Sequence, residues 1–521
     1  MSRHAPALPC VILSALMMAA PIALAAQPGA DAAAQASRLM GEGVALLRSD
    51  RPDEAERCFA QAVVLAPSSP DAHYFLGVVF ERRKQLDQAA QSYRRAIDLA
   101  PRMAEAHDRL GFTLGLQGHT DQALASFEQA VALNPGLFDA QYHLGVTQWL
   151  RRAPQSALAP LNAALKLQPR HAEAHYYLGL TLRALGRLPE AIGHLEKATT
   201  LAPTLAVAYA HLGIAEREHG DLDAARRSLG RALELEPARF DALNALGLTL
   251  MQRGDADQAV ATFTQLVAAH PDEATARLNL GTALMQQGDL AGAVTVLRAL
   301  TDLRPDHAEA FYNLGTALKQ QDDFAGAESA LRQAVRLNPR LPDAHYTLGV
   351  VLWQTGRAAD AIDAFSAAVG AKPDYAQAHY MLGTILRQEG RLEQALIEFR
   401  LALKYEPDSA EAHLSIGQVL RQQNDVAGAD QALAEADRLN KRKADAQAAV
   451  FALSVGRERL KQNDVSAAVE RLKEAVRLDP RNAQAHAELA RALERHGDVR
   501  GARLHLAEAR RLDPSLTAGE R

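Results

Sequence analysis

The stretch AHYYLG at residues 174–179 recurs along this chain at a fixed period. With one letter changed it reads AHYFLG at 72–77, AHYTLG at 344–349 and AHYMLG at 378–383, and all copies are separated by multiples of 34 residues. A fixed period of about 20 to 50 residues is typical of proteins built from stacked structural repeats. The sequence therefore predicts an array of small units.

Three small residues mark each unit. Prolines recur every 34 residues from Pro67 to Pro407, and again at Pro480 and Pro514. A glycine lies 24 residues before each of these prolines, except that Ala490 precedes Pro514, and an alanine lies 12 residues before each. One further unit, in the same register but without the proline, fills the gap after Pro407. We count fourteen units, twelve in residues 36–441 and two in residues 442–515, separated by five inserted residues.

Each unit is predicted to be a helix-turn-helix hairpin. Residues 172–185 carry apolar and small side chains at spacings of three and four, the period of one helical face. Gly186 then suits a left-handed helix end, as do seven glycines and two asparagines in the same register: Gly118, Gly220, Gly254, Gly288, Gly356, Gly390, Gly497, Asn424 and Asn463. Pro189 suits the first turn of a second helix, which Pro203 ends.

Two local details extend this prediction. We expect Asp221, Asp255 and Asp289, each directly after such a glycine, to cap the following helix. The glycine within each first helix, here called the repeat glycine, costs about 1 kcal/mol against alanine, which indicates a close approach of the two helices of the hairpin. No Pro or Gly occurs between Ala429 and Val455, so one long helix is expected to cross the five-residue insertion and to break the array there.

A single hairpin is too small to be stable alone. Its few large apolar side chains would supply on the order of 10 to 15 kcal/mol, whereas ordering its residues costs roughly 50 kcal/mol. Stacking on neighbouring hairpins buries the second face of each helix. The predicted fold class is therefore all-α, an α-solenoid of hairpins.

The unit resembles the tetratricopeptide repeat. It reads His73-x2-Leu76-Gly77-x2-Phe80, then Ala89-x3-Tyr93, then Pro101, with histidine where that family often has tryptophan. The resemblance implies a right-handed superhelix whose first helices line a concave groove that holds peptide segments or partner proteins. It implies no chemistry.

Two specialised functions of that family fit poorly. The lysines by which some members hold the acidic tails of cytosolic chaperones are absent, since no lysine lies three residues before any repeat glycine. The asparagine ladder in the superhelical arm of O-linked N-acetylglucosamine transferases is reduced to Asn279 and Asn313.

Candidate groove residues form a second stripe on each first helix. Positions are counted from the repeat glycine, and the stripe lies at −3, +1, +4 and +5, away from the apolar face. Its aromatic, cationic and amide members are Tyr74, Tyr142, Trp149, Tyr176, Arg183, Gln252, Gln286, Tyr312, Lys319, Gln320, Tyr346, Trp353, Gln354, Tyr380, Arg387, Gln388, Arg421 and Gln422.

These side chains suit an extended peptide, because amides pair with backbone groups and aromatic rings give anchoring area. We hypothesise that repeats seven to twelve form the main binding stretch. In the alternative, the tyrosines fill the seam between neighbouring first helices and the glutamines are solvated helix formers.

No catalytic, cofactor or metal site is predicted. The sequence has no phosphate loop, nucleophile elbow or CxxC pair. His171 and His175 have the spacing of a ligand pair, but no third ligand lies beside them, so a packing role is expected. The net charge of −5, with both signs scattered along the chain, does not indicate nucleic acid as a partner.

The N-terminus has the pattern of a secretory signal. Residues 1–25 hold one basic residue, Arg3, then the apolar run 11–25 that ends in small residues. We expect cleavage and export to a bacterial periplasm or beyond, and otherwise retention as an N-terminal membrane anchor. The predicted function is a non-catalytic scaffold for envelope proteins. The alternatives are a glycan-handling accessory of polysaccharide export and the regulatory arm of a separate glycosyltransferase.

Overall fold

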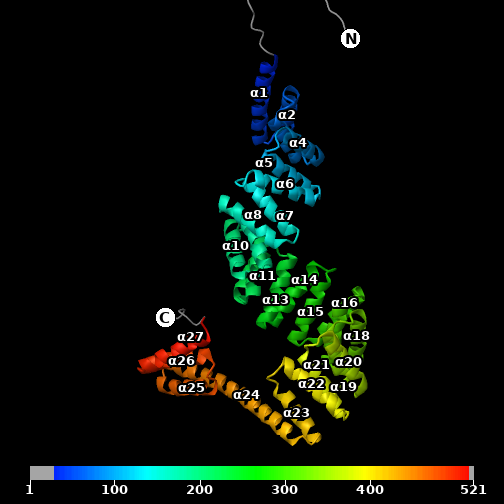
Figure 1. The fold of residues 1–521 in the computed structure, drawn as a ribbon, viewed down its shortest axis with the longest axis vertical. Coiled ribbons are helices and arrows are strands. Elements are labelled where there is room, and N and C mark those ends of the chain that lie inside the picture. Colours follow the sequence, from blue (N-terminus) through cyan, green and yellow to red (C-terminus); the bar gives the residue numbers. More distant parts are fainter. Residues whose placement is uncertain (1–27, 515–521) are drawn as a thin grey trace, which may run out of the picture. The chain divides into compact units, whose positions relative to one another are not determined.

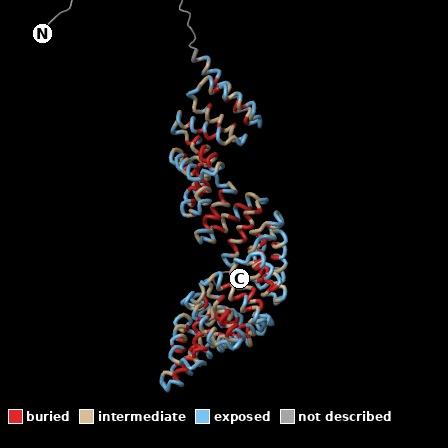
Figure 2. Tube along the Cα trace, turned by 90° about the vertical axis from the view of Figure 1, so that its right-hand side faces the viewer, coloured by how far each residue is buried: buried red, intermediate tan, exposed pale blue. Residues whose placement is uncertain are grey.

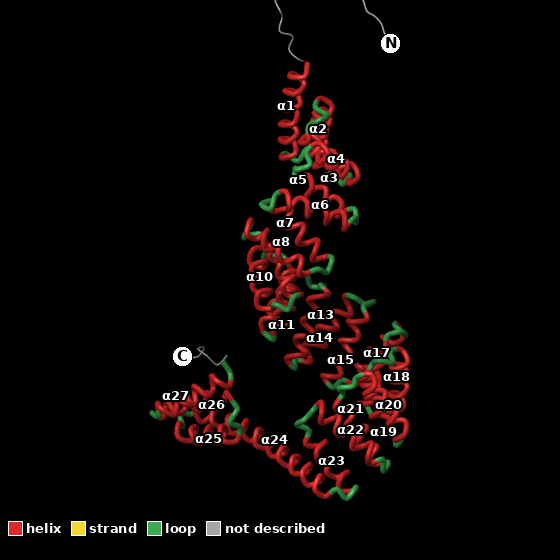
Figure 3. Tube along the Cα trace, viewed as in Figure 1, coloured by secondary structure: helices red, strands yellow, loops and turns green. Residues whose placement is uncertain are grey.

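The computed structural model describes residues 28–514, and in that range the chain consists of α-helices joined by short turns, without a β-strand (Figures 1 and 3). The predicted signal segment at residues 1–25 lies outside the described residues. None of the described helices is both long and apolar enough to cross a lipid bilayer.

Contacts between residues divide the chain into an N-terminal unit, 1–270, and a C-terminal unit, 271–521. The N-terminal unit holds α1 (Pro28–Arg48), α2 (Pro52–Leu65), α3 (Pro70–Arg82), α4 (Leu86–Leu99), α5 (Ala104–Leu116), α6 (Thr120–Leu133), α7 (Phe138–Leu150), α8 (Pro154–Leu167), α9 (Ala172–Ala184), α10 (Leu188–Leu201), α11 (Ala206–His219), α12 (Leu222–Leu235), α13 (Phe240–Arg253) and α14 (Ala256–Ala269).

The C-terminal unit holds α15 (Ala274–Gln287), α16 (Leu290–Leu303), α17 (Ala308–Gln320), α18 (Phe324–Leu337), α19 (Pro342–Gln354), α20 (Ala358–Ala371), α21 (Ala376–Gln388), α22 (Leu392–Tyr405), α23 (Ala410–Gln422), α24 (Val426–Lys461), α25 (Val465–Leu478), α26 (Ala483–His496) and α27 (Val499–Leu512).

Within each unit the helices form hairpins that stack in chain order. The first helix α3 packs on its second helix α4, α4 packs on the first helix α5 of the next repeat, and α3 also touches α5. The same pattern recurs along both units, and Figure 2 shows buried residues, in red, along the described chain. The predicted all-α solenoid of helical hairpins is confirmed.

The repeat glycines allow the two helices of a hairpin to touch. A Cβ atom at Gly179 would lie 2.6 Å from Leu195 Cγ and 3.3 Å from the backbone oxygen of Ala191. All thirteen repeat glycines show the same conflict with the side chain sixteen residues later, from Gly43 with Phe59 to Gly456 with Leu472. The recurrent alanine twelve residues after the glycine is buried as well, and the predicted close approach is confirmed.

The last described hairpin lacks that glycine, and no described hairpin follows its second helix α27. Ala490 takes the place of the glycine, and Leu506, the residue sixteen positions later, is 37% exposed. In the hairpin of α9 and α10, the equivalent Leu195 is fully buried.

The turn between the two helices uses left-handed backbone. All eight glycines predicted there have positive φ, as do Asn424 and Asn463. Asp221 and Asp289 accept hydrogen bonds from backbone N–H groups three residues on, as predicted for helix caps. Asp255 was expected to do the same and does not, because its carboxylate accepts from Arg253 Nε at 2.8 Å instead.

The insertion after residue 441 lies inside one long helix. α24 runs for 36 residues, pairs with α23 through its first part and with α25 through its last part (Figure 1). It thereby joins the second helix of repeat twelve to the first helix of repeat thirteen. The division into twelve repeats and two remains a prediction.

Candidate binding face of the first helices

The exposed side of the candidate stripe is its glutamine row. The amide side chains at position +5 are exposed in six consecutive repeats: Gln252, Gln286, Gln320, Gln354, Gln388 and Gln422. One of the six lies in the N-terminal unit and five lie in the C-terminal unit. The helical period places these five at the same end of α15, α17, α19, α21 and α23.

The tyrosines at position −3 are half-buried between helices. The ring of Tyr346 lies 5.5 Å, centroid to centroid, from the ring of Phe365 in the second helix of the same hairpin. It lies 5.2 Å from the ring of Tyr375. Tyr74 and Tyr380 make the equivalent contacts with Tyr93 and Phe399. These tyrosines fill the seam between repeats and leave part of each ring accessible.

Burial also governs the tyrosine hydroxyl groups. It raises the pKa of Tyr74, Tyr142, Tyr176 and Tyr346, so these hydroxyls stay protonated as hydrogen-bond donors. Tyr142 donates to Glu173 in the first turn of the next first helix, at 2.9 Å. The tyrosine hydroxyl thus links neighbouring repeats.

Side chains at position +4 reach the next repeat in three places. Trp353 Nε1 donates a hydrogen bond to Gln388 Oε1 at 3.3 Å. Arg387 donates to Gln418, at position +1 of the following first helix. In the N-terminal unit, Arg183 lies 3.9 Å from Glu218, which occupies position +5.

The remaining cationic and aromatic candidates behave differently. Trp149 turns its ring edge to Tyr177 at 5.6 Å, in the N-terminal unit. Arg421 is exposed and pairs with Asp430 of its own hairpin at 3.2 Å. Lys319 is half-buried and Tyr312 accepts a hydrogen bond at its backbone oxygen from Thr316. The members of the stripe therefore share residue types from repeat to repeat but make different contacts.

The histidines at position −4 have a structural role. In six repeats the Nε2 atom bonds the carbonyl oxygen of the proline six residues earlier, as in His175 with Pro169 at 3.0 Å. His175 Nδ1 also lies 2.9 Å from His194 Nδ1, and burial lowers the pKa of His194 to about 4. His171 Nδ1 accepts a hydrogen bond from the backbone N–H of Ala174 at the start of α9, so both histidines of this pair are engaged within the fold.

Two repeats place a polar residue in the core at position +3, where most carry leucine. Glu216 is only 7% exposed, and burial raises its pKa to about 7. Gln148 occupies the same position in α7, and its Oε1 atom is buried without a hydrogen-bond partner.

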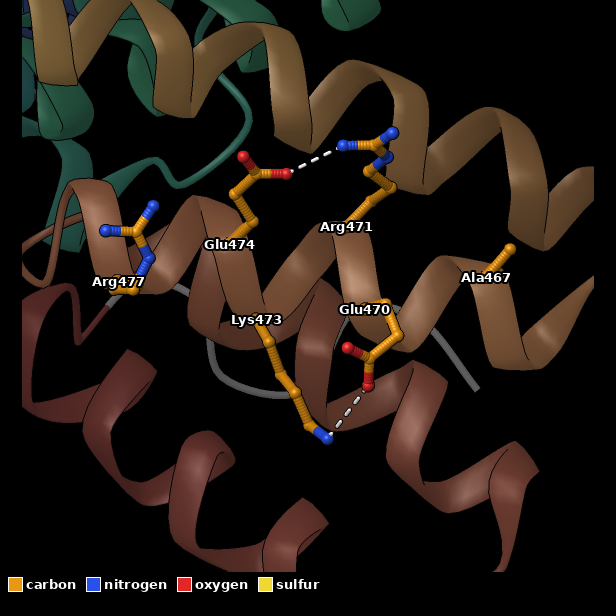
Figure 4. A pocket seen from close by; sticks show the side chains of 6 residues that line it. All are labelled: Ala467, Glu470, Arg471, Lys473, Glu474 and Arg477. Atoms are coloured by element: carbon orange, nitrogen blue, oxygen red, sulfur yellow. Dashed lines mark hydrogen bonds and ion pairs between the residues drawn. The ribbon is translucent and has the colours of Figure 1, made fainter.

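Charged side chains line one depression on the described surface. This depression of about 550 Å³ lies against α25, and the side chains that line it come from that single helix (Figure 4). Lys473 pairs with Glu470 and Arg471 pairs with Glu474, as the dashed lines in Figure 4 show. Among residues 28–514, no group of three or more His, Cys, Asp or Glu side chains could hold a metal ion.

Sequence reasoning found Gln388 but missed the other three acceptors of these four inter-repeat bonds. Glu218 and Gln418 lie on the candidate stripe but outside its glutamine row, and Glu173 lies outside the stripe. One signal was present, because position −6 is acidic in eight repeats, from Asp71 to Glu411. An acidic first turn also stabilises a helix by itself, which hides its use as a tyrosine acceptor.

Two family models match the chain. The model described as tetratricopeptide repeat matches residues 40–104, 115–169, 154–206 and 453–516. The model described as the C-terminal domain of cilia and flagella-associated protein 70 matches residues 238–453. No curated protein sequence matches the chain.

Several solved structures are similar to parts of the chain. MamA is 30% identical over 32% of this chain and 97% of its own, with a TM-score of 0.30. YrrB, described as a TPR protein with an unusual peptide-binding site, is 24% identical over 36% of this chain and 96% of its own, with a TM-score of 0.34. A tetratricopeptide repeat protein from Parabacteroides merdae is 16% identical over 48% of this chain and 98% of its own, with a TM-score of 0.40.

Proposed function

Because the chain is a tetratricopeptide repeat protein, we propose that it is a non-catalytic scaffold that binds extended segments of partner proteins along its first helices. The main binding stretch lies in the C-terminal unit, on α15, α17, α19, α21 and α23. The proposed location is the bacterial cell envelope, which rests on the signal pattern of residues 1–25.

The exposed glutamine row carries this proposal. Five amides repeat at the same position of five stacked helices and face solvent. A row of this kind can donate to and accept from the backbone of a segment that runs across the helices. Trp353 lies beside the row, held by its bond to Gln388, and its half-buried ring offers an anchor of low conformational entropy.

The test removes two amides of the row and the tryptophan beside it, and leaves the seam tyrosines in place. We expect Gln320→Ala, Trp353→Ala and Gln354→Ala together to abolish capture of partners by in-cell crosslinking followed by mass spectrometry. Tyr346 is left in place because its ring supports the packing of α19 on α20.

The matched control carries three exposed residues of second helices instead: Asp363→Ala, Ile397→Ala and Gln431→Ala. It should retain every partner. Equal loss in both variants, or an unchanged partner set in the groove variant, would refute the proposed face. Capture of glycans by the wild type but not the groove variant, on a glycan array, would replace peptide with polysaccharide as the ligand.

The envelope location has its own test. N-terminal sequencing of the protein from fractionated cells should find a new terminus near residue 26 in the periplasmic fraction. Recovery of the intact chain in the cytoplasm would contradict export while leaving the scaffold proposal intact.

A further inference from the structure

Phe451 occupies a position that is covered everywhere else in the interior of the array. Position −5 of the first helix is alanine in twelve repeats, and all twelve are fully buried: Ala72, Ala106, Ala140, Ala174, Ala208, Ala242, Ala276, Ala310, Ala344, Ala378, Ala412 and Ala485. In repeat thirteen the residue is Phe451, which is 72% exposed, and its neighbour Val450 is 61% exposed.

The continuous helix α24 explains this exposure. In the regular array the second helix of one repeat packs on the first helix of the next, as α4 does on α5. Here those two helices are one, so no preceding helix can fold back over residues 450 and 451. In the first repeat, the residue at position −5 is the exposed and charged Arg38.

The preceding repeat is finished with charge, as the last repeat is. Positions +13 and +20 of the second helix face the following repeat, as Ala90 and Ile97 do beside Leu110. Every repeat that stacks on a successor has an apolar residue at one or both positions. Repeat twelve has the exposed Asp430 and Asp437 instead, and repeat fourteen has the exposed Arg503 and Arg510. Repeat twelve therefore ends the regular stack with charged residues. The exposed apolar pair beside this end is the kind of surface that marks a contact with another protein.

The residues around Phe451 form a self-complementary stripe. Lys443, Gln447, Val450, Phe451, Ser454 and Glu458 are all exposed and lie within about 100° of the circumference of α24. When a second α24 runs antiparallel, a two-fold axis between residues 450 and 451 sets three pairs opposite each other. Val450 meets Phe451 of the second copy, Gln447 meets Ser454, and Lys443 meets Glu458.

The charges of the stripe are complementary in this arrangement. Within its own helix, Glu458 lies 3.7 Å from Lys461, and both side chains are more than half exposed. Lys443 and Glu458 are separated by roughly 22 Å along one helix, further than electrostatic attraction reaches at physiological salt. In the antiparallel pair each lysine lies beside a carboxylate, at both ends of an apolar centre. A two-fold contact of this kind closes on itself and does not propagate.

We propose that two copies of this protein associate through antiparallel pairing of α24 over residues 443–458. The stripe is shorter than the interfaces of stable complexes, so the dimer forms in a concentration-dependent manner. The pairing does not involve the glutamine row on α15 to α23. The proposed dimer therefore does not depend on the proposed binding function.

The test is sedimentation velocity of the full chain over a wide range of concentration. Wild-type protein should shift from monomer to dimer as its concentration rises. Phe451→Ala should weaken dimerisation roughly 100-fold, because two copies of the central ring are lost. Leu504→Ala, which removes an equally exposed side chain on α27, is the matched control and should change nothing.

Charge reversal tests the register. Lys443→Glu alone should weaken dimerisation roughly tenfold, and adding Glu458→Lys should restore it, because each pair again joins opposite charges. Circular dichroism confirms that each variant keeps its helices. A chain that stays monomeric at every concentration, a dimer indifferent to Phe451, or a double reversal that fails to restore pairing would each overturn the proposal.

Discussion

Adding one methyl group at Gly179 should force apart the two helices of its hairpin. The new Cβ would lie 2.6 Å from Leu195 Cγ and 3.0 Å from Leu195 Cδ2, whereas carbon atoms in contact are about 3.5 to 4.0 Å apart. Leu195 is fully buried, and the new Cβ would also lie 3.3 Å from the backbone oxygen of Ala191, which cannot rotate away as a side chain can. The helices must therefore separate by about 1 Å, or the leucine must leave its preferred rotamer.

The magnitude follows from two opposing effects. Overpacking a core costs about 1 to 3 kcal/mol, and replacing glycine by alanine within a helix returns about 1 kcal/mol. Gly193→Ala in α10 is the matched control, because a Cβ there meets nothing within 4 Å and only the favourable effect remains. We expect Gly179→Ala to be less stable than Gly193→Ala by about 1 to 3 kcal/mol.

Native-state hydrogen exchange of the full chain measures this difference. A repeat array opens locally rather than as one unit, so a single melting temperature would average the effect away. Protection of the α9 and α10 amides should fall in Gly179→Ala and rise in Gly193→Ala. In a Leu195→Ala background, Gly179→Ala should cost much less, since the side chain that it strikes is gone. Equal protection in the two single variants would refute the close-contact explanation.

Two further perturbations test the core and the caps. Glu216→Leu should stabilise α11 and α12 above pH 7 by up to about 3 kcal/mol, and the gain should fade as the pH falls to about 4.5. The sign follows because the folded state holds the proton of Glu216 up to about pH 7, so ionisation of this carboxyl destabilises the wild-type fold as the pH rises. Exchange rates without this pH dependence would contradict the prediction. Asp221→Ala should cost about 1 kcal/mol through loss of a helix cap, measured by exchange in α12. Asp255→Ala should cost α14 less, because that side chain makes no cap, and equal losses would count against the cap assignment.

Local signals in the sequence were sufficient for the hairpins. Glycine at Gly186 and asparagine at Asn424 mark left-handed turns because these residue types adopt that backbone most readily. Four other repeats adopt it at the same position without that signal: Asp50, Lys84, Arg152 and Asp322. The repeat glycines indicate contact between helices because nothing else compensates for glycine within a helix. The cap at Asp255 was predicted wrongly because Arg253, two residues away, competes for the same carboxylate.

For the candidate binding face, the sequence predicted the residue types but not their contacts. Its residue types and its period could be read from the sequence, and the glutamine row is exposed as a binding surface requires. The contacts of its members could not, because Trp353 and Gln388 are 35 residues apart and meet only when repeats stack. Burial of Tyr346 depends in the same way on Tyr375 of the next repeat.

What the sequence determined by itself is the period, the hairpin and the all-α class, because turns, caps and helical faces depend on residues within one unit. Only the tertiary structure decided which equivalent positions are covered. Ala412 and Phe451 share position −5, yet one is fully buried and the other is exposed. The physical reason is that burial depends on the neighbouring hairpin, and α24 runs straight where that neighbour would have folded back.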